Sequence, residues 1–143
     1  MQIKHILRDK GREVVTISSD ATLSEAARML ARKHIGALVV RGTDGAIVGI
    51  LSERDLVHAL ADASVAALAH SVSNYMSRNV VTCSETDPVD ELMEVMTRRR
   101  FRHVPVVEAD RLVGIISIGD VVKSCIAETT REAATLRGYI AAG

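Results

Sequence analysis

The sequence predicts a mixed α/β (α+β) protein made of two copies of a β-α-β-β-α unit and an extended C-terminal helix. Two observations carry this prediction. Apolar residues switch between helical and strand spacing in the same order in both halves of the chain. Shifted by 66 residues, 14–40 shows seven identities with the second half, and shifted by 65 residues, 47–57 shows six, which makes 13 in 38 positions. The duplication predicts two repeats packed about a pseudo-twofold axis.

Each repeat opens with a short β-branched segment, 14–17 or 80–83, which we expect to be a strand. A helix start follows in both. Residues 22–25 read Thr-Leu-Ser-Glu, a capping box, and Asp87 precedes Pro88 as a cap before a proline at the first helical position. Apolar residues then recur at the i, i+3, i+4, i+7 spacing of one buried helical face. These positions are Leu23, Ala26, Ala27 and Leu30 in the first repeat and Val89, Leu92, Met93 and Met96 in the second.

Two further strands in each repeat are predicted to form a hairpin that leads into a closing helix. The strands are 37–41 and 46–51 in the first repeat, and 103–107 and 111–117 in the second.

The predicted organisation is a first repeat with its N-terminal lead-in at 1–63, a linker at 64–79, a second repeat at 80–128 and a helical extension at 129–143. Residues 3–7 and 72–76 occupy equivalent lead-in positions. Because a half of about 50 residues buries too little apolar surface alone, we expect the strand layers of the two repeats to pack together.

Composition excludes several classes of function. Lys+Arg and Asp+Glu are both 18, so the net charge is +0 and no broad basic field for nucleic acid exists. The apolar runs are too short to cross a membrane, and the charged N-terminus does not resemble a signal peptide, so we expect a cytoplasmic protein without a membrane or nucleic-acid partner. Cys83 and Cys125 lie 42 residues apart without a C-x-x-C pattern, so we expect reduced thiols rather than metal ligands. The five histidines show no metal spacing, and we expect no metal site.

Three motifs carry a resemblance to a known family. Residues 49–55 read Gly-Ile-Leu-Ser-Glu-Arg-Asp, residues 114–120 read Gly-Ile-Ile-Ser-Ile-Gly-Asp, and residues 102–106 read Arg-His-Val-Pro-Val. Together with the duplication, these motifs resemble the cystathionine-β-synthase (CBS) domain pair, or Bateman module. The resemblance covers nearly the whole chain. It implies a stand-alone regulatory module that binds an adenine nucleotide, AMP first with NAD or ATP as alternatives, and signals to an effector protein that the sequence does not name.

The resemblance implies a nucleotide site in the second repeat. There the glycine at 114 allows close approach of a ligand, the Ser117 hydroxyl and the helix N-terminus face a phosphate, and Asp120 accepts the ribose hydroxyls. Arg102 and His103 are expected on the phosphate side, and backbone groups near Thr82 at the adenine edge. The expected nucleotide-binding residues are Thr82, Ser84, Arg102, His103, Pro105, Gly114, Ser117, Ile118, Gly119 and Asp120.

Both Ser-x-x-Asp motifs have a simpler interpretation as helix caps, which is compatible with a ligand site. The first repeat reads His-Ile-Gly-Ala at 34–37 where the second reads Arg-Phe-Arg-His at 100–103, so its site lacks these cations and has Arg54 as an alternative source of charge. We expect this site to be empty, weaker, or occupied by another adenosine compound. The expected residues of this weaker site are Asp55, Ser52, Arg54, Thr16 and Ser18.

Apolar residues near the C-terminus follow a coiled-coil period of 4, 3, 4, 3 and 4 residues, which predicts a homodimer. They are Val122, Ile126, Thr129, Ala133, Leu136 and Ile140.

Two other functions remain open at this stage. A module whose pockets are relics would be an interaction scaffold. A nucleotide hydrolase is remote, because Ser117, His103 and Asp120 lack a nucleophile elbow and the chain has no P-loop. We therefore expect no catalytic residue and no enzyme activity.

Overall fold

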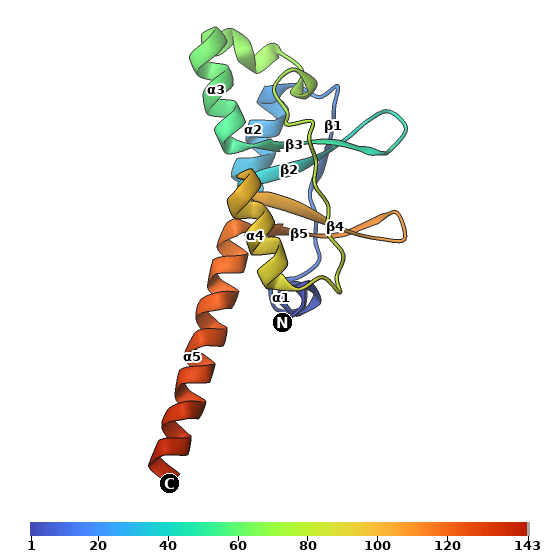
Figure 1. Cartoon of the computed structure of the whole chain (residues 1–143). Coiled ribbons are helices and arrows are strands. Elements are labelled where there is room, and N and C mark those ends of the chain that lie inside the picture. Colours follow the sequence, from blue (N-terminus) through green and yellow to red (C-terminus); the bar gives the residue numbers. More distant parts are fainter. Residues whose placement is uncertain (143) are drawn as a thin grey trace. The chain divides into compact units, whose positions relative to one another are not determined.

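A computed structural model describes residues 1–142 and divides the chain into two compact units. Unit 1 combines Met1–Arg12 with the chain from Cys83 onward, and unit 2 is Glu13–Thr82. Figure 1 labels the helices and strands of both units. The architecture is the predicted mixture of helices with small sheets. The predicted helices and strands follow one another in the predicted order except for one strand, described below, and the structure adds helix α1 (Ile3–Lys10) and two 3₁₀ segments that were not predicted.

Unit 2 contains a three-stranded sheet in the order β1-β2-β3, in which β1 is parallel and β3 antiparallel to β2. The capping box predicted at 22–25 forms in part, since the Thr22 hydroxyl accepts a hydrogen bond from the Glu25 amide at 3.2 Å. The helices pack apolar faces against the sheet to form one core. The elements are β1 (Thr16–Ser18), α2 (Leu23–Lys33), β2 (Ala37–Arg41), β3 (Ile47–Ser52), α3 (Glu53–Ala63) and two 3₁₀ segments, Ser64–Ala69 and Val72–Asn74.

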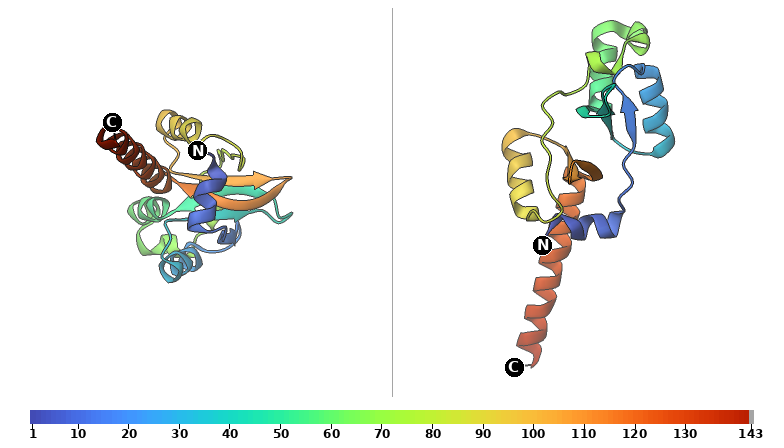
Figure 2. Two further views of the ribbon diagram at one scale, coloured as in Figure 1. Left: turned by 90° about the horizontal axis from the view of Figure 1, so that it is seen from below. Right: turned by 90° about the vertical axis from the view of Figure 1, so that its right-hand side faces the viewer.

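Unit 1 contains the antiparallel hairpin β4-β5, a separate core and the longest helix of the chain. Helix α5 begins directly at the end of β5 and continues beyond the other elements of its unit, as Figures 1 and 2 show. The predicted C-terminal extension and the closing helix are therefore one continuous helix. The elements are α1 (Ile3–Lys10), α4 (Val89–Arg99), β4 (His103–Glu108), β5 (Arg111–Ser117) and α5 (Ile118–Ala142).

The strand predicted at 80–83 is wrong, because only Cys83 pairs, in a single parallel bridge with Val106. The reason lies in Pro105. In the first repeat, the equivalent Val39 donates its amide to the Val15 carbonyl at 3.2 Å and so extends the ladder between β1 and β2. Pro105 has no amide hydrogen to donate, so the ladder ends after one bridge.

The cap predicted for the second repeat is also corrected. Helix α4 begins at Val89, with the extended Pro88 (φ −67°, ψ 139°) as its N-cap residue rather than its first helical residue. Asp87 instead closes the preceding turn, where its Oδ2 accepts the Ser84 amide at 2.8 Å. The aspartate stabilises a turn before the helix, and α4 itself has no side-chain cap.

The compact units cut the chain at different places from the sequence repeats. Helix α1 packs with the second repeat, where a β-carbon added at Gly114 would lie 2.6 Å from Leu7 Cδ2. The segment around Met76 packs with the first repeat, where a β-carbon added at Gly49 would lie 2.6 Å from Met76 Sδ. Each lead-in thus places one large side chain over the glycine of the strand that precedes the closing helix.

Candidate functional site

The junction of β5 and α5 is held by a reciprocal cap between Ser117 and Asp120. The Ser117 Oγ accepts the Asp120 amide at 3.1 Å, and Asp120 Oδ2 accepts the Ser117 amide at 2.9 Å. The capping interpretation of the motif is therefore correct. The arrangement also fixes a hydroxyl, a carboxylate and the N-terminus of a long helix at one place in unit 1.

The start of β4 lies beside this junction. His103 is the cross-strand partner of Ser117, and the Ile118 amide donates to the Arg102 carbonyl at 2.8 Å. The Arg102 side chain is exposed. The structure therefore brings together five residues of the predicted site: Arg102, His103, Ser117, Ile118 and Asp120. Gly119 lies in the first turn of α5.

Lys10, the last residue of α1, contacts the same carboxylate and was missed by the sequence analysis. Its Nζ donates to Asp120 Oδ2 at 2.7 Å and to the Ile115 carbonyl at 2.9 Å. The two side chains are 33% and 22% exposed, so the ion pair is partly shielded from water. Lys10 precedes Asp120 by 110 residues, and no local pattern in the sequence could have indicated the contact.

The pKa of Asp120 lies below its ordinary value. Burial raises the pKa, but the hydrogen bond and charge of Lys10 and the hydrogen bonds from Ser117 outweigh that effect. Asp120 is therefore a carboxylate at neutral pH, and it is an acceptor only.

Thr82 and Ser84, predicted at the adenine edge, lie in the segment beside β4. Thr82 is exposed, and Ser84 uses its polar groups locally: its Oγ donates to Glu108 Oε1 at 2.6 Å and its amide to Asp87. Glu108 is at the opposite end of β4 from His103, so Ser84 does not join the group around the cap. Burial, and then the charges of Asp87 and Glu108, raise the pKa of the intervening Cys83 to about 12, which makes this thiol a poor nucleophile.

Packing explains Pro105 and Gly114, but not Gly119. Pro105 is buried in β4, where its carbonyl accepts the Cys83 amide at 3.0 Å. Gly114 is required by the side chain of Leu7, which explains this glycine without any ligand. A β-carbon at Gly119 would meet Ser117 Oγ at an ordinary 3.6 Å, so sterics do not demand glycine there.

The first repeat contains the same junction without the added cation. Ser52 and Asp55 cap α3 reciprocally, with Asp55 Oδ2 2.8 Å from the Ser52 amide, and the Glu53 amide donates to the Gly36 carbonyl. Arg54 is exposed on α3. A cavity of about 530 Å³ opens beside Gly36 and Glu53, and its lining among the described residues contains no lysine or arginine.

Thr16 and Ser18 are the first and last residues of β1. The Ser18 hydroxyl accepts the Asp20 amide at 3.2 Å, as a turn residue does.

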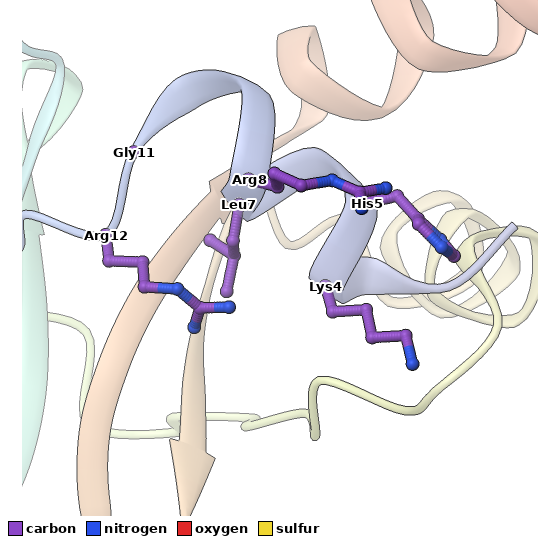
Figure 3. Close-up of a pocket in the computed structure, with 6 residues that line it drawn as sticks. All are labelled: Lys4, His5, Leu7, Arg8, Gly11 and Arg12. Carbon is purple, nitrogen blue, oxygen red and sulfur yellow. The ribbon is translucent and has the colours of Figure 1, made fainter.

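A cationic cavity of about 540 Å³ lies along α1 in unit 1. Figure 3 shows that Lys4 and Arg12 extend on one side of the helix, and Arg8 and His5 on another. Arg12 forms an ion pair with Glu85, which neutralises part of this charge.

Residues 1–142 contain neither a metal-binding cluster nor a membrane-spanning helix. No cluster of three or more His, Cys, Asp or Glu side chains in this range is arranged to hold a metal ion. None of the helices in the same range combines the length and the apolar character needed to span a membrane.

Comparison with known proteins places this geometry in a family. The model of the CBS domain matches residues 3–62 and 72–127, so the chain belongs to the CBS domain family and is a CBS domain pair. A CBS-domain protein of Agrobacterium tumefaciens has 53% sequence identity and a TM-score of 0.81, over 85% of this chain and 91% of that one.

Two other similar structures contain adenosine compounds. A CBS domain protein of Pyrobaculum aerophilum, complexed with AMP, is 32% identical, with a TM-score of 0.74 over 84% of this chain and 89% of that one. The CBS domain pair of protein MJ0100, in complex with 5′-methylthioadenosine and S-adenosyl-L-methionine, is 29% identical, with a TM-score of 0.79 over 90% and 98% of the two chains.

Proposed function

We propose that this CBS domain pair is a cytoplasmic regulatory module that binds an adenine nucleotide in unit 1 and signals its occupancy to a partner protein. The observation that carries the proposal is the Ser117–Asp120 cap beside His103, which gathers the groups that a ribose phosphate requires at one helix N-terminus. The adenosine compounds bound by two related CBS pairs support the ligand class. AMP is the first candidate, and NAD and ATP are larger members of that class.

In this proposal each group has one task. Asp120 accepts the ribose hydroxyls, and the Ser117 hydroxyl with the Gly119 amide binds phosphate, because the Ile118 and Asp120 amides already donate to the Arg102 carbonyl and to Ser117 Oγ. Arg102 and His103 add charge-assisted hydrogen bonds on the phosphate side. The module acts by binding and not by catalysis. A ligand signals only if it binds two conformations of the module with different affinity.

The first repeat supplies a weaker site at Ser52 and Asp55. It has the same reciprocal cap, but Arg54 is the one arginine or lysine among its predicted residues, and the cavity beside Gly36 and Glu53 carries none among the described residues. An anionic ligand therefore gains less Coulomb energy there than beside Arg102 and His103.

Calorimetric titration of wild type, Asp120→Ala and Asp55→Ala with AMP, ATP, NAD and S-adenosylmethionine tests the proposal. Both substitutions remove one cap acceptor, but Asp55→Ala also removes the proposed weaker site of the first repeat, so it controls for the loss of a cap while the tighter site of unit 1 stays intact. We expect one nucleotide to bind wild type and Asp55→Ala, and to bind Asp120→Ala at least tenfold more weakly. Binding that survives in Asp120→Ala would place the site elsewhere, and binding to none of the proteins would favour an interaction scaffold. Release of inorganic phosphate from ATP would instead indicate a hydrolase.

Helix α5 supports a second part of the proposal, which is homodimerisation. The coiled-coil positions of α5 form an apolar seam whose large side chains are exposed to water: Ile126 is 63%, Leu136 63% and Ile140 73% exposed. Exposed apolar seams of this spacing bind another helix. Glu132 and Arg137 flank the seam five residues apart, the spacing that pairs opposite charges between two parallel helices. We propose a parallel pairing of α5 with α5 of a second copy.

A further inference from the structure

We infer that Lys10 sets the affinity of the nucleotide site, because its ammonium occupies the carboxylate that ribose hydroxyls must reach. The inference rests on the proposed function. It adds a residue of α1 that lies outside the strand-helix motif and that competes with the ligand rather than binding it.

The hydrogen bonds described for the Asp120 side chain fall on one carboxylate oxygen. Oδ2 receives the Ser117 amide at 2.9 Å and the Lys10 ammonium at 2.7 Å, and the ammonium has a second acceptor in the Ile115 carbonyl. The Ser117 amide is fixed by the cap. A ribose diol that donates its two hydroxyls to the two carboxylate oxygens therefore competes with Lys10 for Oδ2.

Displacement of Lys10 does not require α1 to leave the unit. Ile3 and Leu7 are 0% exposed and hold the helix in the core, whereas Lys10 is its last residue. Gly11 follows with φ +101° and with nothing within 4 Å of an added β-carbon, while its amide donates to the Leu7 carbonyl and Arg12 pairs with Glu85. Two residues later, at Glu13, the chain enters unit 2. Ligand binding thus frees the Lys10 side chain and leaves the backbone at the end of α1 in place.

Titration of Lys10→Met with adenosine and with AMP tests this competition. A partly exposed ion pair contributes modestly, so we expect both ligands to bind about two- to fivefold more tightly than to wild type. Lys10→Arg keeps a cation for Asp120 and is expected to behave like wild type. Lys4→Met removes a lysine from the same helix that has no hydrogen bond to Asp120 among the described contacts, and it serves as the matched control.

Chemical acetylation gives a second measurement, independent of variants. An ammonium held by a carboxylate reacts slowly, so adenosine is expected to raise acetylation of Lys10 by N-hydroxysuccinimide acetate at least twofold, with Lys4 as internal reference. Mass spectrometry of the digested protein reports both sites.

The outcomes separate the two proposals. Weaker AMP binding by Lys10→Met, with adenosine unchanged and Lys10 protected by AMP, would show that Lys10 binds phosphate and would overturn the competition. Unchanged affinity for both ligands would also overturn it while the proposed site stands. Absence of binding to wild type and to Lys10→Met would refute the nucleotide site together with this inference.

Discussion

Replacing Gly114 with alanine tests whether this glycine serves packing or a ligand. The added β-carbon would lie 2.6 Å and 2.9 Å from the two methyl carbons of Leu7, against an ordinary carbon contact of about 3.5–4.0 Å. Leu7 is 0% exposed and has to move by about 1 Å inside a filled core. Overpacking of this kind costs about 1–3 kcal/mol. In a chain of this length that lowers Tm by roughly 3–10 °C.

Urea and thermal unfolding without nucleotide, followed by circular dichroism, measure the effect. Gly138→Ala is the control, since Gly138 lies exposed in α5 with nothing within 4 Å of an added β-carbon, and alanine there is expected to stabilise by about 0.5–1 kcal/mol. The double variant Leu7→Ala with Gly114→Ala is expected to lose less stability than the sum of the single changes, because the smaller side chain leaves room for the methyl group. A Gly114→Ala protein as stable as wild type would refute the packing argument and leave close approach of a ligand as the reason for glycine.

Three further predictions concern charge, reactivity and assembly. The pKa of Asp120 is lowered in the folded protein, so its contribution to stability is complete above about pH 4 and disappears as the pH falls through the folded pKa. Lys10→Met removes one cause of the lowered pKa, so we expect this variant to be less stable than wild type at neutral pH. Acid titrations of unfolding are expected to show that this difference vanishes as the pH falls through the folded pKa. Cys83 is expected to react with iodoacetamide at pH 8 more than tenfold more slowly in the native protein than in urea, as mass spectrometry of alkylated peptides would show, and equal rates would contradict its raised pKa. Leu136→Lys is expected to convert a dimer to a monomer in light scattering, whereas Arg131→Lys, away from the apolar seam, is expected to change nothing.

Local patterns in the sequence predicted most of the secondary structure and the cap. The Ser117–Asp120 motif specifies its own geometry, since the two residues satisfy each other's amides three positions apart. The hairpins followed from β-branched runs separated by turn residues. The absence of a strand at 80–83 is also encoded in the sequence, because Pro105 stands where a paired strand needs an amide. The β-branched pattern of 80–83 alone does not reveal it.

Contacts between distant segments could not be predicted in the same way. The association of α1 with the second repeat depends on Leu7 fitting over a glycine more than one hundred positions away. The ion pair of Lys10 with Asp120 follows from that placement and from nothing in the flanking sequence. Periodicity reports which face of an element is apolar, and it does not report which other element covers that face.

The N-terminal segment packs with the second repeat rather than the first, and this affects the order in which the two units are completed during synthesis. Unit 2 is one contiguous stretch, Glu13–Thr82, so all residues of its core are synthesised in one uninterrupted run. Unit 1 must wait, because its first helix is made before unit 2 and its strands only after unit 2 is complete. Until then the apolar face of α1, with Ile3 and Leu7, lacks the strands that cover it and is exposed on the nascent chain.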